Sequence, residues 1–278
     1  MNAAHPKMNP VMDRILITGA AGAIGSTLRA GMQDTYALLR LSDIRSLGKP
    51  ASGEEIVQAD LGDLEAVHSL MSGIDCVVHL GGVPHEGPWN AILDNNIVGT
   101  YNVFEAARLS GVKRVVFASS NHAVGYYRTR EKIGVNEPVR PDSRYGVSKV
   151  FGEALGRLYA DKHGLSVACL RIGSFRDQPE DFRQLATWIS PRDMVQLVLR
   201  CIHAPAFHYL VLYGVSANTR ARWANPHATM IGYEPRDNAE EHAMRFSEPA
   251  AGGSEPAVGF HGGSFCGLEF DGDVQRIE

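Results

Sequence analysis

The chain has 278 residues, of which 44% are hydrophobic and 21% are charged. Such a chain can bury a large core as one domain, or as one domain with an appendage, which excludes general disorder. Lys and Arg total 27 against 31 Asp and Glu, so the net charge of -4 excludes a bulk positive field for nucleic acid or an anionic membrane. The longest apolar stretches are far shorter than the roughly 20 residues of a membrane-spanning helix.

The N-terminal residues 1–12 hold two prolines, a single Lys and no apolar run, which matches neither a secretory signal nor a transit peptide. We expect a disordered leader there. The four cysteines lack metal-binding spacing, and three of them lie in apolar runs: Cys76, Cys169, Cys201 and Cys266. They indicate buried thiols in a cytoplasmic protein, with no metal site.

From residue 13 onward, short β-branched runs alternate with amphipathic stretches. Seven runs bounded by Gly, Asp, Ser or Pro are predicted as strands, at 14–18, 37–41, 55–58, 76–80, 114–118, 167–172 and 209–213. Five stretches with apolar residues three and four apart are predicted as helices, at 22–32, 64–71, 91–109, 145–163 and 192–203. The pattern predicts an α/β fold, a Rossmann-type doubly wound parallel sheet of about seven strands.

Two connections follow strand ends and are long enough to form binding loops, at 121–144 and 173–181. Ligands bind at the carboxyl ends of the strands in such sheets. The periodicity weakens after residue 213, and 250–263 holds five glycines among Ser, Pro and His. We therefore predict a nucleotide-binding domain with the catalytic residues at 13–215, and a small substrate-side region with a loosely structured tail at 216–278.

A glycine-rich turn, GAAGAIG at 19–25, follows the first predicted strand and opens the first helix. Gly19, Gly22 and Gly25 let the backbone turn sharply and approach a pyrophosphate. The helix N-terminus, with Ala23 and Ile24, presents unpaired N–H groups and a positive dipole end. Such a turn can also serve only to pack a helix closely on a strand, so the motif by itself leaves both interpretations open.

Asp43 closes the second predicted strand, 18 residues after Gly25. A carboxylate there can accept hydrogen bonds from the adenosine ribose and would repel a 2′-phosphate, which favours NAD over NADP as the cofactor. Arg45 lies close enough to leave NADP open. Asp60 and Leu61 follow the third strand and are placed to meet the adenine, although Asp60 can alternatively cap a helix.

Tyr145 and Lys149 lie four residues apart at the start of a predicted helix, on one face. An unperturbed phenol titrates near pH ~10, and a nearby ammonium with a cationic nicotinamide would lower its pKa. Tyr145 would then take the proton of a substrate hydroxyl as hydride leaves the carbon. This spacing also occurs by chance, so the pair needs support from other residues.

The support is the sequence Ser119-Ser120-Asn121-His122, which directly follows the strand predicted at 114–118. A hydroxyl at that strand end would face Tyr145 across the site and hold the substrate oxygen. The alternative is that these polar residues only satisfy the strand end and a turn.

Together these motifs resemble the extended short-chain dehydrogenase/reductase superfamily, of the NAD-dependent epimerase/dehydratase type. The resemblance covers residues 13 to about 215 and is carried by Gly19 to Gly25, Asp43, Asp60, Leu80-Gly81-Gly82, Asn96-Ile97-Val98-Gly99, Ser120 and Tyr145 to Lys149. It implies a catalytic triad of Ser120, Tyr145 and Lys149. It further implies that Lys149 binds the nicotinamide ribose and that Asn96 supports the proton relay.

A narrower resemblance is to uronate dehydrogenases, short members of that superfamily that oxidise C1 of a cyclic hexuronic acid with NAD to an aldarolactone. The similar stretches are FASSNHAVGYY at 117–127, RPDSRYGVSK at 140–149, RIGSF at 171–175, FRQLATW at 182–188 and FHGGSF at 260–265. The resemblance implies that Ser120, Asn121 and His122 contact sugar oxygens. It also implies that Ser174 lies by the substrate and that Arg183 binds the uronate carboxylate.

The chemistry of Arg183 predicts the same role without the resemblance. A guanidinium on a short helix after a binding loop can bind a carboxylate through two parallel hydrogen bonds. The alternative is a surface salt bridge with Asp181 or Glu180. One departure from the uronate dehydrogenases is Pro84-His85, where those enzymes carry a substrate-contacting Ser. Proline has neither a hydroxyl nor an N–H, so that contact is lost or is replaced by His85.

Phe175 also stands where a small residue is expected, which bears on the identity of the sugar. Glucuronate and galacturonate both remain open as substrates. Within the superfamily, the alternatives are a nucleotide-sugar epimerase or dehydratase and a neutral sugar dehydrogenase. A further alternative is a non-catalytic NAD-sensing regulator, which would not need the Ser, Tyr and Lys set. Apolar residues on several faces of the helices at 91–109 and 145–163 indicate a homo-oligomer.

Overall fold

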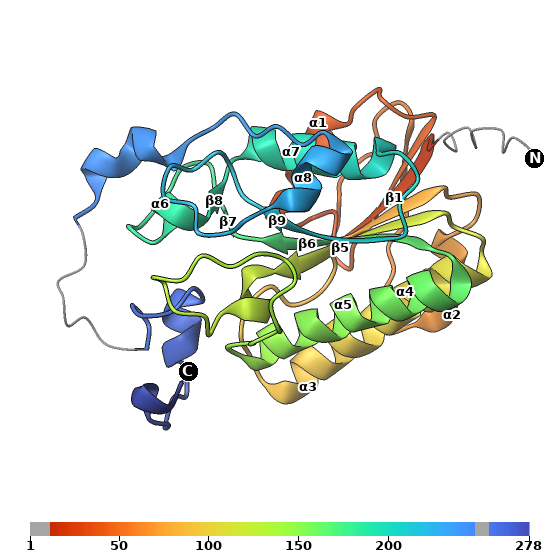
Figure 1. Cartoon of the computed structure of the whole chain (residues 1–278). Coiled ribbons are helices and arrows are strands. Elements are labelled where there is room, and N and C mark those ends of the chain that lie inside the picture. Colours follow the sequence, from red (N-terminus) through yellow and green to blue (C-terminus); the bar gives the residue numbers. More distant parts are fainter. Residues whose placement is uncertain (1–11, 248–255, 278) are drawn as a thin grey trace, which may run out of the picture.

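A seven-stranded parallel sheet forms the centre of the protein in a computed structural model that describes residues 12–247 and 256–277 (Figure 1). Its strand order is β3-β2-β1-β4-β5-β6-β9. The bounds are β1 Arg14–Thr18, β2 Leu38–Ser42, β3 Glu54–Ile56, β4 Cys76–His79, β5 Arg114–Ser120, β6 Ser166–Ile172 and β9 Tyr209–Gly214. The predicted Rossmann-type sheet is confirmed, and its inner strands are apolar runs because both faces are covered.

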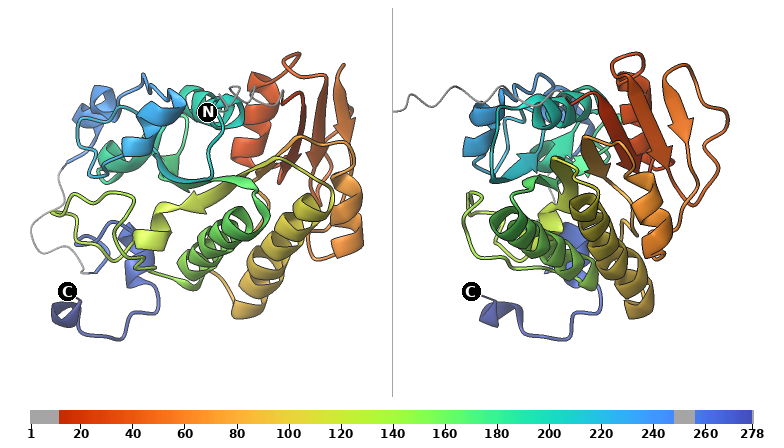
Figure 2. Two further views of the ribbon diagram at one scale, coloured as in Figure 1. Left: turned by 45° about the vertical axis from the view of Figure 1, so that its right-hand side comes forward. Right: turned by 90° about the vertical axis from the view of Figure 1, so that its right-hand side faces the viewer.

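Helices cover both faces of the sheet, as Figures 1 and 2 show. One face carries α1 Ala23–Gly31, α7 Pro191–His203 and α8 Pro226–Ile231. The other carries α2 Leu64–Leu70, α3 Trp89–Ile92, α4 Gly99–Leu109 and α5 Arg144–His163. Each layer encloses its own apolar cluster, so the sheet is buried from both sides.

The helix predicted at 91–109 is interrupted by a π-helical turn, Leu93–Val98, between α3 and α4. The wider turn carries Asn96 into the interior, where it is 2% exposed. Its Oδ1 accepts from the Val83 N–H at 2.8 Å, and its Nδ2 donates to the Val83 carbonyl and the Ser148 hydroxyl, both at 3.0 Å. The predicted helix is confirmed, since the chain is helical from Trp89 to Leu109, but these tertiary hydrogen bonds accompany a π-helical segment that the sequence did not predict.

Short elements after β6 build one wall of the cleft described below. They are β7 Ser174–Phe175, α6 Gln184–Thr187 and β8 Trp188–Ile189, with β7 paired in parallel to β8. The 3₁₀ turns are Asn121–Val124, Ala239–Arg245, Gly263–Gly267 and Val274–Arg276. Of these elements the sequence predicted only a short helix near Arg183, which corresponds to α6, because the others are too short to show a period.

The C-terminal segment 256–277 packs on the loop that follows β5, as both sets of views show. His261 N–H donates to the Tyr127 carbonyl and Gly262 N–H to the Gly125 carbonyl, each at 2.9 Å. Phe260, His261 and Cys266 are buried. The expectation of a loose tail is therefore wrong for 256–263, and its remainder, 250–255, lies outside the described residues.

Met12 is buried in the core, which corrects its assignment to the leader, while residues 1–11 lie outside the described part of the chain. All four cysteines are buried and free, as their apolar surroundings predicted. Within 12–247 and 256–277, no helix is both long enough and apolar enough to span a membrane.

Candidate active site

A cleft of about 970 Å³ opens at the carboxyl ends of β1, β4, β5 and β6. The chain runs outward from β1 to β3 and then crosses back to β4, so the cleft lies where the strand order reverses. The following predicted cofactor residues line it: Gly19, Gly22, Ala23, Ile24, Gly25, Asp43, Asp60, Leu61, Leu80, Gly81 and Gly82. Asn96 does not line it and instead positions the 81–83 loop from behind.

The glycine loop leaves no room for side chains at two of its positions. Gly19 has φ +70°, and a Cβ there would lie 2.6 Å from the Gly81 nitrogen. A Cβ on Gly25 would lie 2.5 Å from the Gly19 carbonyl oxygen. No side chain caps α1 at Gly22, so the N–H groups of its first turn face the cleft. A pyrophosphate fits this backbone cradle.

Asp43 ties the glycine loop to the end of β2. Its Oδ2 accepts from the Ala21 N–H and its Oδ1 from the Arg45 N–H, both at 2.9 Å. Asp60 accepts from the Gly62 N–H at 2.8 Å and lines the cleft, whereas the cap of α2 is Asp63. The alternative role of Asp60 as a helix cap was therefore wrong.

Asp43→Ala should weaken NAD binding and relax discrimination against NADP. The ribose acceptor and the repelling charge disappear together, and a hydrogen bond to a charged group contributes about 1.5–3 kcal/mol. We expect kcat/KM for NAD to fall roughly tenfold to a hundredfold. Asp43→Asn is the matched control, because it can keep the contact to Ala21 while losing the charge. Faster turnover of the unmodified enzyme with NADP would show that Arg45 governs the choice.

The three predicted catalytic side chains meet on the cleft floor and are buried: Ser120 at 5%, Tyr145 at 8% and Lys149 at 7% exposure. Ser120 ends β5, while the other two lie one turn apart on α5. Ser120 lies close enough to Tyr145 to lower the pKa of its phenol, although burial raises that pKa by more. The Lys149 Nζ lies 5.4 Å from the centre of the Tyr145 ring.

Two residues that the sequence did not single out hold the start of α5. The Ser143 hydroxyl caps the Gly146 N–H at 3.0 Å. Glu86, in the loop after β4, accepts from the Tyr145 N–H at 2.9 Å and from Arg144 at 2.6 Å. Glu86 lies 58 residues before its partner Arg144, so no local pattern could indicate this contact.

Burial has the largest effect on the pKa values of Tyr145 and Lys149. It raises the pKa of Tyr145 to about 12, against the opposing effect of Ser120. It lowers the pKa of Lys149 to about 8. The sequence-based expectation that a nearby ammonium lowers the tyrosine pKa is not met in the protein alone, because desolvation is the larger effect.

Lys149→Met should stabilise the cofactor-free protein at pH 7 while abolishing activity. Below about pH 8 the Lys149 ammonium is charged in both the folded and the unfolded chain. Between pH 8 and its usual 10.5 the folded chain loses the proton first, so the stability of the unmodified protein rises with pH. Removing the group should raise the free energy of unfolding at pH 7 by up to about 3 kcal/mol.

Urea unfolding at pH 7 and pH 9.5 measures the free energy of unfolding of Lys149→Met and of the unmodified protein. The difference between the two proteins should be smaller at the higher pH. Lys162→Met, an exposed position on the same helix, serves as the control and should change neither value. A Lys149→Met protein that is less stable than the unmodified protein at pH 7 would contradict the argument.

His122 is held between a carboxylate and an aromatic ring. Its Nδ1 lies 2.7 Å from Asp142 Oδ2, and its ring stacks on Phe265 at 3.9 Å between centres. The Asp142 side chain is fully buried, and a Cβ on Gly125 or Gly262 would collide with its carboxylate. The Asp142 contact fixes Nδ1 as the protonated nitrogen, which leaves Nε2 for a ligand in the cleft.

Arg183 directly precedes α6 and is fixed by polar contacts to neutral groups. Its Nε and Nη2 donate to the His261 carbonyl at 3.0 and 2.8 Å. The Asn121 amide, oriented to donate to the Ile172 carbonyl at 3.1 Å, accepts from Arg183 Nη2 at 3.0 Å. Only the Nη1 end of the Arg183 guanidinium is therefore left to bind a ligand, since the Nε edge already binds a backbone carbonyl.

The alternative salt bridge of Arg183 does not form within the described ranges. Asp181 instead accepts from the Gln184 N–H at 2.8 Å, and Glu180 pairs with Arg176 at 3.0 Å. Burial lowers the pKa of Arg183, as expected for a cation away from water. A guanidinium without a carboxylate partner therefore borders the cleft.

Ser174, His85 and Phe175 also line the cleft. The Ser174 hydroxyl lies 2.9 Å from that of Thr187. His85 is exposed, and its Nδ1 donates to the Glu86 carbonyl at 2.9 Å, so only Nε2 is available there. Phe265 is the principal residue that sequence patterns missed, and it comes from the segment 256–277, far along the chain.

A family model described as "NAD dependent epimerase/dehydratase family" matches residues 15–190 of the chain. The chain belongs to this family.

Curated and solved relatives agree with this membership. Uronate dehydrogenase of Pseudomonas putida is 43% identical over 257 residues, 91% of this chain and 96% of that enzyme. A crystal structure of uronate dehydrogenase from Agrobacterium tumefaciens superimposes with a TM-score of 0.87 at 43% identity, covering 95% of this chain and 98% of that one. A mutant of that enzyme, complexed with NAD, gives 0.87 at 42% identity, covering 95% and 99%.

NAD is the cofactor of this family member, and the cleft fits it. The uncapped start of α1 would hold the pyrophosphate, Asp43 the adenosine ribose and Lys149 the nicotinamide ribose. The tight approach of Gly19 to Gly81 keeps that route along the strand ends free of side chains.

Proposed function

We propose that this NAD-dependent dehydrogenase oxidises C1 of a hexuronic acid, glucuronate or galacturonate, to the aldarolactone. The observation that carries the proposal is Arg183, a cation beside Ser120, Tyr145 and Lys149 that has no carboxylate partner among residues 12–247 and 256–277. The uronate dehydrogenases that resemble this chain over nine-tenths of its length support the same substrate class.

The oxidation removes a proton from the C1 hydroxyl and a hydride from C1, which leaves a C1 carbonyl. NAD supplies the acceptor for the hydride. Tyr145 takes the proton, and the Ser120 hydroxyl holds the same oxygen as its bond order rises. The Lys149 Nζ lies 5.4 Å from the centre of the Tyr145 ring, where an ammonium would favour the phenolate.

The remaining cleft residues would orient the sugar. His122 presents Nε2 to a hydroxyl, with Asp142 holding the ring, and Ser174 lies on the β7 side. Asn121 acts chiefly through Arg183, because its amide is shared between that guanidinium and Ile172. Arg183 Nη1 would bind the uronate carboxylate at the far end of the sugar, and the exposed His85 stands where the expected Ser is missing.

Two other enzyme classes fit the site less well. Nucleotide-sugar dehydratases carry an acid pair near the position of Ser120, and this chain has Ser119 and Asn121 there. A neutral sugar dehydrogenase needs no cation in its substrate site. The unpaired guanidinium of Arg183 therefore favours the acid.

A substrate panel tests the proposal directly. Uronic acids, neutral hexoses and nucleotide sugars are each supplied with NAD or NADP, and the absorbance of the reduced cofactor is followed. We expect oxidation of uronic acids with NAD, and much weaker oxidation of the matching neutral hexoses. Equal rates on the acid and the neutral sugar would replace the proposal with a neutral sugar dehydrogenase.

We also propose a homo-oligomer in the cytoplasm, with the nucleotide-binding part at 13–215 and a substrate-side part at 216–278. The support for assembly is the apolar exposure on the outer helices. Tyr101 and Leu109 on α4 are 44% and 55% exposed, and Val147 and Leu158 on α5 are 45% and 49% exposed. Such a face is more typical of a subunit interface than of a free surface.

A further inference from the structure

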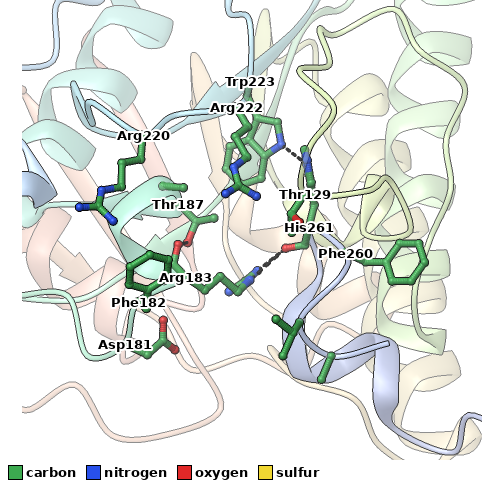
Figure 3. A pocket seen from close by; sticks show the side chains of 13 residues that line it. Thr129, Asp181, Phe182, Arg183, Thr187, Arg220, Arg222, Trp223, Phe260 and His261 are labelled. Carbon is green, nitrogen blue, oxygen red and sulfur yellow. Dashed lines mark hydrogen bonds between the residues drawn. The ribbon is translucent and has the colours of Figure 1, made fainter. Parts of the chain in front are cut away.

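A second pocket, of about 310 Å³, lies behind Arg183, on the side of the segment that follows β9 (Figure 3). Arg183 and Asp181 line both this pocket and the cleft, so the two share a wall. Its volume falls within the range of small-ligand sites, about 300–1,000 Å³. The proposed reaction uses none of the residues on its far side.

Two guanidinium groups reach this pocket without a carboxylate partner in the described ranges. Arg222 extends into it from the segment after β9, and Arg183 borders it from the start of α6 (Figure 3). Burial lowers the pKa of Arg222, whose side chain makes no hydrogen bond or ion pair with the rest of the described chain. Two half-buried cations that share one cavity repel each other unless an anion lies between them.

The other charges around the pocket are already engaged. Arg220 is paired with Glu240, with both nitrogen-to-oxygen distances at 2.7 Å. Asp181 accepts from the Gln184 N–H at the start of α6, and its negative charge offsets part of the Arg183 charge. Arg183 and Arg222 together still leave the pocket with a net positive charge.

The remaining walls suit an organic body better than a bare oxyanion. Phe182 and Val258 contribute carbon surface, and Thr129 and Thr187 contribute hydroxyl-bearing side chains. A lone phosphate would leave most of this volume and all of its aromatic surface unused. A hydroxylated carbon chain with a carboxylate would meet the cations, the rings and the hydroxyls together.

We propose that this pocket is a second ligand site, which binds a small hydroxylated carboxylic acid with its carboxylate between Arg183 and Arg222. The site is separate from the substrate cleft but coupled to it through Arg183. A carboxylate held on the pocket side neutralises part of the Arg183 charge, so it should raise the KM for uronate without changing kcat. This coupling, unlike the binding itself, rests on the proposed function.

Calorimetric titration with glucarate, a six-carbon hydroxylated dicarboxylate, tests the site on the full chain with NADH bound. We expect two binding events per chain, one in the cleft and one in the pocket. Arg222→Gln should remove one event or weaken it roughly tenfold to a hundredfold, as expected for one lost charge-assisted contact. Arg276→Gln, which removes an arginine whose side chain is 88% exposed, should keep both.

Val258→Trp gives a second variant that does not depend on Arg222. Val258 is 42% exposed and lines the pocket but not the cleft, so a larger ring there fills the pocket with little risk to the fold. It should also remove one binding event. With either variant, uronate oxidation without glucarate should be unchanged. The rise in KM that glucarate causes should be smaller than in the unmodified enzyme, because only competition in the cleft remains.

Three outcomes would overturn the site. One is the same stoichiometry with the same affinities in the unmodified protein, Arg222→Gln and Val258→Trp. Another is equally tight binding of inorganic phosphate at the Arg222-dependent event, which would leave the carbon walls without a role. The third is equally tight binding of sorbitol, which would remove the role of the charge. If the Arg222-dependent event is present but uronate is not a substrate, the proposed function fails and the second site stands.

Discussion

Replacing Tyr145 by phenylalanine should lower kcat on uronate by roughly 10²-fold to 10⁴-fold, the range that a positioned general acid or base contributes. The change removes the group that takes the C1 hydroxyl proton and leaves the ring in place. That ring packs edge-on against His122 and Phe265, at 5.8 and 6.1 Å between centres, so the cleft should keep its shape. NAD binding should stay nearly unchanged.

Steady-state rates together with NAD binding followed by fluorescence check this result. A kinetic isotope effect with uronate deuterated at C1 shows whether chemistry limits the rate. If it does, a Tyr145→Phe enzyme with more than a tenth of the original kcat is incompatible with Tyr145 as the base. Ser120→Ala is the companion variant, and it should lower kcat less, because Tyr145 keeps its transferable proton.

Arg183→Met should lower kcat/KM for the uronic acid roughly tenfold to a hundredfold. A charge-assisted contact to the carboxylate contributes about 1.5–3 kcal/mol, and methionine keeps much of the side-chain length without the charge. The substitution also deprives the His261 carbonyl of two donors and Asn121 of one. That structural disturbance should affect acidic and neutral sugars alike.

The ratio of the two substrates separates the charge from the structural disturbance. The preference for the acid over the matching neutral hexose should collapse in Arg183→Met and survive in part in Arg183→Lys, which keeps the charge. An equal fall on both substrates in Arg183→Met would make the arginine purely structural. The carboxylate would then have to be held elsewhere, and His85 is the next candidate in the cleft.

Local sequence patterns predict the sheet, the nucleotide loop and the proposed catalytic pair. Strands buried on both faces must be continuous apolar runs, so β4 and β5 are visible without tertiary information. The glycine loop and the Tyr145–Lys149 pair are local, because a tight turn and one helical turn fix their geometry within a few residues. Asp43 could be placed because it ends a strand that pairs with the neighbouring one.

The contacts of the side chains around these elements depend on long-range packing. The Asn96 amide is hydrogen-bonded to Val83 and Ser148, because a π-helical turn directs it inward. Arg183 binds the carbonyl of His261, a residue 78 positions later, and so presents only one end of its guanidinium. Phe265 reaches His122 from 143 positions further along the chain. Local periodicity carries no information on such pairings, because they depend on how distant segments pack once the sheet has formed.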